Sequence, residues 1–171
     1  MPHPANPHLA FVVGGARSGK SRHAEALVAT HPAPWLYLAT AEIRDDEMRA
    51  RIDEHRRRRG SGWRICEVPL RLGATLAAET GPALVDCLTL WLTNVMLGEH
   101  DVGLACDELV DVLSARTAPT VVVSNEVGLG IVPDNALARR FRDAAGVLHQ
   151  RVAAISGSVV FMVAGLPMVV K

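Results

Sequence analysis

The sequence of 171 residues has few cysteines and no excess of charge of either sign. Its three cysteines, Cys66, Cys87 and Cys106, lie far apart and include no C-x-x-C pair. This spacing excludes a disulfide framework and a zinc knot, and it favours reduced thiols in a cytoplasmic protein. Lys and Arg together number 18, as do Asp and Glu, so no basic field attracts nucleic acid or an anionic membrane.

Long apolar runs are also missing. No stretch reaches the length that spans a bilayer, and the first ten residues, MPHPANPHLA, have three prolines and no signal-peptide core. We therefore expect a disordered tail over residues 1–8, and one domain over residues 9–171 in a cytoplasmic protein.

Short apolar runs rich in branched side chains predict buried parallel strands. These runs are Leu9–Val13, Trp35–Ala39, Ala83–Asp86, Thr120–Ser124 and Val159–Ala164, with Met168–Val170 as a last edge strand. Helical patterns lie between them, at 19–30, 45–59, 103–116 and 134–155, while residues 88–97 are ambiguous. Asp134, after Pro133, is the expected cap of the longest helix. Alternating strands and helices predict an α/β fold with a mostly parallel sheet flanked by helices.

The most specific motif is FVVGGARSGKSRHAEALV, in which Gly14, Gly19, Lys20 and Ser21 satisfy G-x-x-x-x-G-K-[ST]. The motif follows an apolar strand and opens a helix, which is the context of a phosphate-binding P-loop. Glycines let backbone N–H groups point at phosphate oxygens, and the helix start adds positive charge. Lys20 is expected to reach the β- and γ-phosphates, and Ser21 to ligate Mg²⁺. The chain is therefore predicted to bind a nucleoside triphosphate.

Two acidic residues end predicted strands near this loop. Asp86, in ALVDC, is the candidate carboxylate for Mg²⁺, although a turn or helix cap explains an Asp there equally well. Glu126, in VVVSNEVG, is a candidate general base or substrate-positioning residue, with a structural cap as the alternative. Ligands of α/β proteins bind beyond the carboxyl ends of parallel strands, which favours a functional role for both.

The segment Asp45–Arg59 begins with DDE and ends with RRRR, so a solvated helix aligned with its dipole accounts for most of its charge. His55 nevertheless shares a helical stripe with Met48 and Ile52, and arginines flank it. Guanidinium groups disfavour the protonated imidazole and would bind a triphosphate, which suits a nucleophile that attacks phosphorus. A nucleic-acid site is the weakest reading, because no aromatic residues are interleaved with the arginines.

The sequence resembles the bifunctional adenosylcobinamide kinase/adenosylcobinamide-phosphate guanylyltransferases of cobalamin biosynthesis. The similarity runs through GGARSGKSRHAEAL, YLATAEIRDDEMRARIDEHR, VDCLTLWLTN and VVSNEVGLGIVPDNALARRFRDAAGVLHQRVA. The second and fourth of these runs are much narrower signatures than the phosphate loop, which many families share.

This resemblance implies a RecA-like P-loop NTPase domain, a homotrimer, and two reactions. Adenosylcobinamide would be phosphorylated with GTP or ATP, and adenosylcobinamide phosphate would then receive GMP from GTP through a guanylylated histidine, here His55. The nucleotide contacts implied by the resemblance are Gly14, Gly15, Ala16, Arg17, Ser18, Gly19, Lys20, Ser21, Ala39, Thr40, Ala41, Arg56, Arg57, Arg58, Arg59, Glu67 and Asp86. Two alternatives are a plain P-loop kinase of a small metabolite, and a nucleotide-dependent switch or motor subunit.

Overall fold

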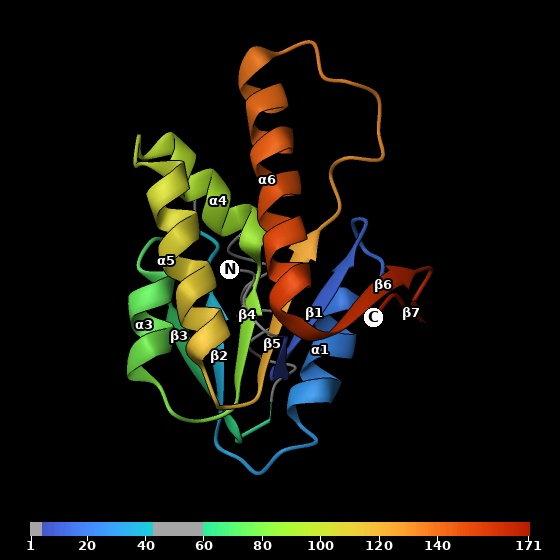
Figure 1. The fold of residues 1–171 in the computed structure, drawn as a ribbon. Coiled ribbons are helices and arrows are strands. Elements are labelled where there is room, and N and C mark those ends of the chain that lie inside the picture. Colours follow the sequence, from blue (N-terminus) through green and yellow to red (C-terminus); the bar gives the residue numbers. More distant parts are fainter. Residues whose placement is uncertain (1–4, 43–59) are drawn as a thin grey trace.

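The structure, a computed structural model, describes residues 5–42 and 60–171 (Figure 1). The strands are β1 (Asn6–Gly14), β2 (Trp35–Ala39), β3 (Trp63–Glu67), β4 (Ala83–Asp86), β5 (Thr120–Asn125), β6 (Ser156–Val163) and β7 (Leu166–Val169). The helices are α1 (Lys20–Val28), α3 (Leu72–Ala78), α4 (Leu88–Leu97), α5 (Val102–Ala115) and α6 (Ala136–Ile155).

All seven strands form one sheet in the order β3-β2-β4-β5-β1-β6-β7. Every neighbouring pair is parallel except β6 and β7, which form an antiparallel hairpin at one edge. The structure thus confirms the predicted α/β fold with a mostly parallel sheet, of the P-loop NTPase type. Parallel strands bring all their carboxyl ends to one edge, and this edge is where the site residues gather.

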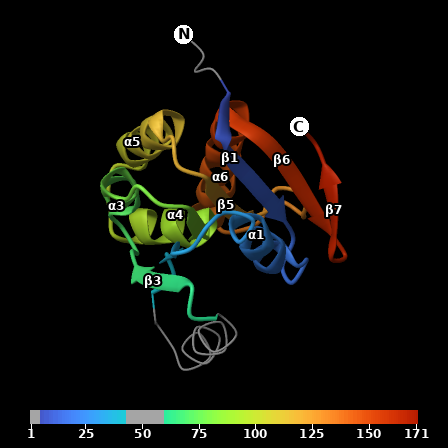
Figure 2. The ribbon, with the colours of Figure 1, turned by 90° about the horizontal axis from the view of Figure 1, so that it is seen from below.

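Two apolar clusters hold helices against the two faces of the sheet (Figure 2). On one face Phe11, Leu38 and Val122 pack with buried residues of α3, α4, α5 and α6. On the other face Val12 and Val123 pack with α1. Because β1, β2, β4 and β5 are covered on both faces, their sequences are continuous apolar runs without polar alternation.

The start of the domain differs from the expectation. Residues 6–8 belong to β1, so the prediction of a disordered tail over residues 1–8 is wrong for them. Asn6 is buried, and its side-chain amide donates to the carbonyl oxygens of Leu113 and Arg116 at 2.8 and 2.7 Å. These bonds join the start of β1 to the end of α5, which a reading of apolar runs alone could not detect.

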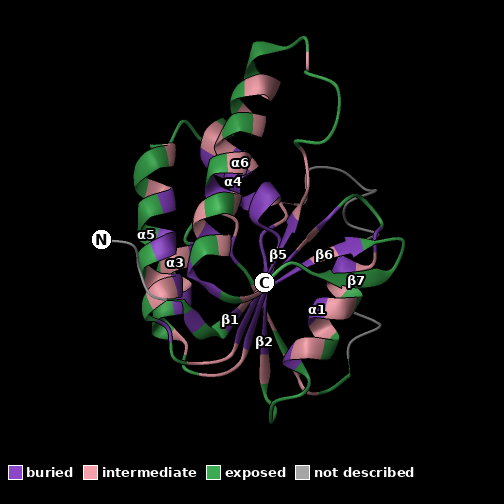
Figure 3. Ribbon diagram, turned by 45° about the vertical axis from the view of Figure 1, so that its right-hand side comes forward, coloured by how far each residue is buried: buried purple, intermediate pink, exposed green. Residues whose placement is uncertain are grey.

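Other elements also correct the sequence reading. Residues 88–97, which the sequence left ambiguous, are helical. The strand β3 and the helix α3 were not predicted. The helix α6 is capped by the side chain of Asn135, not by Asp134. The last strand lies at the sheet edge, as expected, but it is antiparallel to β6 and exposed, not parallel (Figure 3). In β3, WRICE mixes polar and apolar residues because the strand lies at the sheet edge.

Candidate functional site

The phosphate loop joins the end of β1 to the start of α1. A Cβ atom at Gly14 would lie 2.7 Å from the carbonyl oxygen of Met162 and 2.9 Å from Ser18 Oγ, so only glycine fits there. Gly19, which precedes α1, has φ +92°, a conformation that side chains rarely adopt. Both glycines of the motif are therefore required by backbone geometry, and the loop joins a strand to a helix, as the sequence predicted.

Lys20 is the buried cation of this loop. Its side chain is only 7% exposed, and its Nζ donates to the carbonyl oxygen of Gly15 at 2.5 Å. Burial lowers the pKa of Lys20, while the nearby Cys87 and Asp86 oppose this shift. A desolvated ammonium group is costly without anionic partners, and phosphate oxygens would supply them.

Ser21 and Asp86 meet although their elements are distant in sequence. Ser21 Oγ donates to Asp86 Oδ2 at 2.8 Å, and the hydroxyl of Tyr37 donates to the same oxygen at 2.8 Å. Ser21 lies in the first turn of α1, and Asp86 is the last residue of β4. The structure therefore brings together the two residues predicted to hold Mg²⁺. The sequence analysis did not identify Tyr37. Tyr37 lies in β2, the strand paired with β4, and is therefore close enough to bond to Asp86.

The other predicted contacts line the ends of β2 and β3. Ala39 pairs with both Asp86 and Glu67 in the sheet, which places those three residues side by side. Thr40 is fully buried; its Oγ1 accepts from the Cys87 backbone N–H at 2.8 Å and donates to the Cys87 carbonyl at 2.7 Å.

Next in the chain, Ala41 is half-buried. Asn94, which the sequence did not single out, donates to the Thr40 carbonyl at 2.8 Å and so fixes this turn from α4.

Glu126 lies just beyond β5, and its backbone N–H donates to the Gly14 carbonyl oxygen at 2.9 Å. Its carboxylate accepts a hydrogen bond from the Gly128 N–H, which is the capping contact that the sequence left open as an alternative. His149 of α6 lies close enough to be influenced by the Glu126 charge, and its Nε2 is 2.7 Å from Ser124 Oγ. Burial lowers the pKa of His149, and Glu126 partly offsets this. The role of Glu126 in the reaction stays a prediction.

His55 and the arginines Arg56, Arg57, Arg58 and Arg59 lie outside the described residues, as does the whole of the predicted helix Asp45–Arg59. Within residues 5–42 and 60–171, no group of three or more His, Cys, Asp or Glu side chains is arranged to hold a metal ion. None of the helices in this part of the chain combines the length and apolar character of a membrane span.

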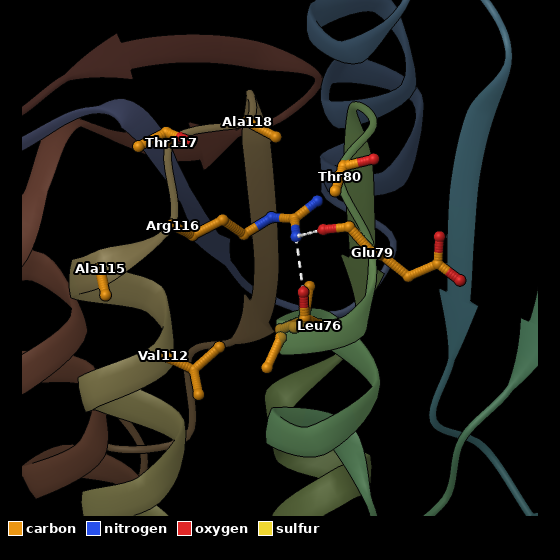
Figure 4. A pocket seen from close by; sticks show the side chains of 9 residues that line it. Leu76, Glu79, Thr80, Val112, Ala115, Arg116, Thr117 and Ala118 are labelled. Atoms are coloured by element: carbon orange, nitrogen blue, oxygen red, sulfur yellow. Dashed lines mark hydrogen bonds between the residues drawn. The ribbon is translucent and has the colours of Figure 1, made fainter.

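A pocket of about 330 Å³ is lined by residues of the segments 76–80 and 112–118 (Figure 4). These segments precede β4 and β5, so the pocket lies near the amino ends of the strands, at the opposite end from the phosphate loop. Arg116 crosses it and donates to the carbonyl oxygens of Leu76, Glu79 and Gly81 and to Thr120 Oγ1. Burial lowers the pKa of Arg116, with Glu79 opposing the shift. With four of its five N–H groups already bonded, the guanidinium acts as an internal clamp between α3 and β5.

The fold and the site define a nucleotide-binding protein of the P-loop class. Residues 10–170 match the family described as cobinamide kinase/cobinamide phosphate guanyltransferase. The chain is 48% identical to the bifunctional adenosylcobalamin biosynthesis protein CobP of Pseudomonas aeruginosa, with 94% of this chain and 96% of that protein covered. It is 42% identical to the protein CobU of Salmonella typhimurium and 39% identical to CobU of Escherichia coli, which bear the same descriptive name. Each of these two alignments covers 95% of this chain and 99% of the relative.

The chain therefore belongs to the cobinamide kinase/cobinamide phosphate guanyltransferase family. This confirms the resemblance recognised in the sequence, and with it an enzyme of cobalamin biosynthesis that has kinase and guanylyltransferase activities. Membership of this family rules out the two alternatives, a plain small-molecule kinase and a nucleotide-dependent switch.

Proposed function

We propose that the chain phosphorylates adenosylcobinamide with GTP or ATP, and then transfers GMP from GTP to adenosylcobinamide phosphate by way of His55. The observation that carries this proposal is the phosphate loop, in which buried Lys20 lies beside the Ser21–Asp86 pair. Both reactions begin with a triphosphate, and one loop of this kind can hold it for each.

In the kinase step the protein contributes mainly by neutralising the charge of the transferred phosphoryl group, and it forms no covalent bond to that group. The bond between the γ-phosphorus and the β-bridging oxygen breaks as the corrinoid hydroxyl oxygen bonds to the γ-phosphorus, and the hydroxyl proton is released. Backbone N–H groups of residues 14–21 and the ammonium of Lys20 would bind the phosphate oxygens. The buried position of Lys20 makes this attraction stronger than it would be in water.

We include Mg²⁺ in the proposal because the oxygen donors at Ser21 and Asp86 suit it. Mg²⁺ prefers oxygen ligands and is commonly held by one or two protein groups together with substrate phosphates. Since the Ser21 hydroxyl donates its hydrogen bond to Asp86, its lone pairs are left for a cation. When bound, the ion would neutralise part of the charge of the substrate phosphates.

The guanylyl step uses a different phosphorus atom. A nitrogen of His55 attacks the α-phosphorus of GTP, a P–N bond forms, and pyrophosphate leaves. The phosphate oxygen of adenosylcobinamide phosphate then attacks the same phosphorus and displaces the histidine. Arg56, Arg57, Arg58 and Arg59 follow His55 directly, and their charge would bind the triphosphate and keep the imidazole neutral.

Labelled GTP tests this proposal directly. The wild type incubated with Mg²⁺ and α-labelled GTP should retain about one GMP per chain after denaturation, whereas γ-label should be lost. A phosphoramidate hydrolyses in brief acid and survives alkali, because protonation of the ring nitrogen makes it a good leaving group. His55→Ala should retain no label yet still phosphorylate adenosylcobinamide. An acid-stable adduct, or one that persists in His55→Ala, would refute the assignment of His55.

We further propose that the chain is a cytoplasmic homotrimer. Its reduced-type cysteine pattern supports the location. Exposed apolar side chains on the edge strand β7, such as Leu166 and Val169 at 71% and 75% exposure, support assembly. Light scattering after size exclusion should give three times the 18.3 kDa mass of the chain, and a monomer mass would contradict the trimer.

A further inference from the structure

The strand β5 lies between the two strands that carry the nucleotide site. The order β4-β5-β1 places its end between Asp86, which ends β4, and Gly14, which opens the phosphate loop. Ser21, in the first turn of the helix that follows β1, is bonded to Asp86 at 2.8 Å although β5 lies between β1 and β4, so this bond passes over the end of β5. A terminal phosphate held by Lys20 and Ser21 therefore lies next to the last residues of β5.

Asn125 is the polar residue at that end. It pairs with Gly14 in the sheet, two residues beyond Val123, which pairs with Asp86. Alternation along β5 places Asn125 on the same face as Val121 and Val123, which pack with α1. This is the face from which the phosphate loop and Lys20 approach.

The amide of Asn125 is held by a buried hydroxyl. Its Nδ2 donates to Thr89 Oγ1 at 3.2 Å, and Thr89, in the first turn of α4, is 5% exposed. Thr89 Oγ1 lies 3.1 Å from the sulfur of Cys87, the residue after Asp86. An amide nitrogen carries two hydrogens, and the bond to Thr89 uses one of them. The second suits an anionic oxygen, and Asn125 itself is only half-buried.

We propose that Asn125 is a catalytic residue of the kinase reaction, whose amide N–H donates to an oxygen of the γ-phosphoryl group, and that Thr89 is the positioning residue that orients it. This inference rests on the proposed binding of the triphosphate at the phosphate loop. Charge on the γ-phosphoryl oxygens is redistributed as the bond to the β-bridging oxygen breaks, so a fixed neutral donor stabilises the transition state. In the guanylyl step pyrophosphate leaves from the α-phosphorus, and there the same contact contributes to binding alone.

The test compares Asn125→Ala and the isosteric Asn125→Asp with the wild type. Asn125→Ala should lower kcat of the kinase by roughly 10²-fold, the usual loss for one transition-state donor, and should affect the rate of His55 guanylylation much less. Asn125→Asp places a carboxylate beside the γ-phosphate, so affinity for ATP should fall more than affinity for ADP, which lacks that group. Titration of ATP and ADP by calorimetry reports this ratio without requiring turnover.

Thr89→Val removes the hydroxyl while keeping the side-chain shape, and it should lower kcat several-fold with little change in KM for ATP. Thr93→Val is the matched control, because Thr93 makes its own bond to the Thr89 carbonyl one turn along α4 and should leave kcat unchanged. Equal loss of ATP and ADP affinity in the Asn125 variants, or equal slowing of both reactions, would overturn the proposal. A wild type that binds neither nucleotide would instead refute the triphosphate site.

Discussion

At the scale of single residues, Asp86 shows how the site is organised. Its Oδ2 accepts from Ser21 and Tyr37 at 2.8 Å each, so the carboxylate is fixed from α1 and from β2 at once. A carboxylate oxygen that accepts from two hydroxyl donors is fixed in its orientation. A turn or helix cap would accept from a backbone N–H. The Asp86 carboxylate accepts instead from two side-chain hydroxyls, which favours the functional interpretation.

His149 provides a pH-dependent prediction at the same scale. Burial lowers its pKa below the ordinary value of 6.5, and Glu126 is the charged group that offsets part of the shift. Between the lowered pKa and 6.5 the unfolded chain binds more protons than the folded chain, so stability should fall as the pH decreases through that window. The slope contributed by one such group cannot exceed about 1.4 kcal/mol per pH unit.

Urea unfolding at several pH values would measure this effect. His149→Gln lacks a titrating ring, so its free energy of unfolding should depend less on pH, below the ordinary histidine pKa of 6.5, than that of the wild type. The difference between the two curves isolates His149 from the other titrating groups. Parallel curves would show that His149 has the same pKa in both states.

At the scale of elements, the phosphate loop is supported from outside. The turn between β6 and β7 lies against it, and the Gly165 N–H donates to the Ser18 carbonyl oxygen at 3.1 Å. Ala164 and Gly165 both have positive φ, as a tight hairpin turn requires. The antiparallel hairpin at the sheet edge thus holds the loop in place, a role that the sequence did not suggest for the last strand.

Arg116 links other elements at the opposite end of the sheet. Replacement of Arg116 by Met would leave three carbonyl groups, those of Leu76, Glu79 and Gly81, without this donor. We expect a loss of about 3–5 kcal/mol in the free energy of unfolding, measured by chemical denaturation. KM for the nucleotide should stay within about twofold at a temperature where the variant is folded, because the clamp lies far from the phosphate loop.

Arg142→Met is the control, since Arg142 pairs with the exposed Asp143 at 3.2 Å and such surface pairs contribute about 0–1 kcal/mol. An Arg116→Met variant as stable as this control would show that the buried hydrogen bonds add nothing net. A large rise in KM with unchanged stability would place Arg116 in the binding site and refute the clamp.

The sequence predicted those elements that are determined by residues close together in the chain. Continuous apolar runs identified β1, β2, β4 and β5, because strands covered on both faces need them, and the glycines around Lys20 predicted the phosphate loop. The edge strand β3 and the burial of Asn6 escaped detection, because they depend on partners more than 20 residues away. In the site, motif spacing identified Ser21, and a position at the end of an apolar strand identified Asp86. Tyr37 and Thr89 were missed because only the packing of β2 and α4 brings their hydroxyls to the site.

At the scale of the whole molecule, the proposed function makes two reactions depend on the one phosphate loop found among the described residues. The carboxyl ends of β1, β2, β4 and β5 form one continuous edge, and the predicted contacts among residues 14–21, 39–41, 67 and 86 lie along it. The α-phosphorus and the γ-phosphorus of one bound triphosphate are both reachable from such an edge by different nucleophiles. A single nucleotide site can therefore serve a kinase and a guanylyltransferase in turn.

Lys20→Ala tests whether the two reactions share that site. Lys20 neutralises β- and γ-phosphate charge in both steps, so its removal should slow both the kinase reaction and the guanylylation of His55 by at least roughly 10²-fold. Single-turnover measurements with γ-labelled ATP and α-labelled GTP would give the two rates on one preparation. Since the ammonium group is buried, its loss should not lower stability, and a circular dichroism melt would verify that the variant is folded. If guanylylation survived at near the wild-type rate while the kinase was lost, the GTP for that step would have to bind elsewhere, and the two activities would require two sites.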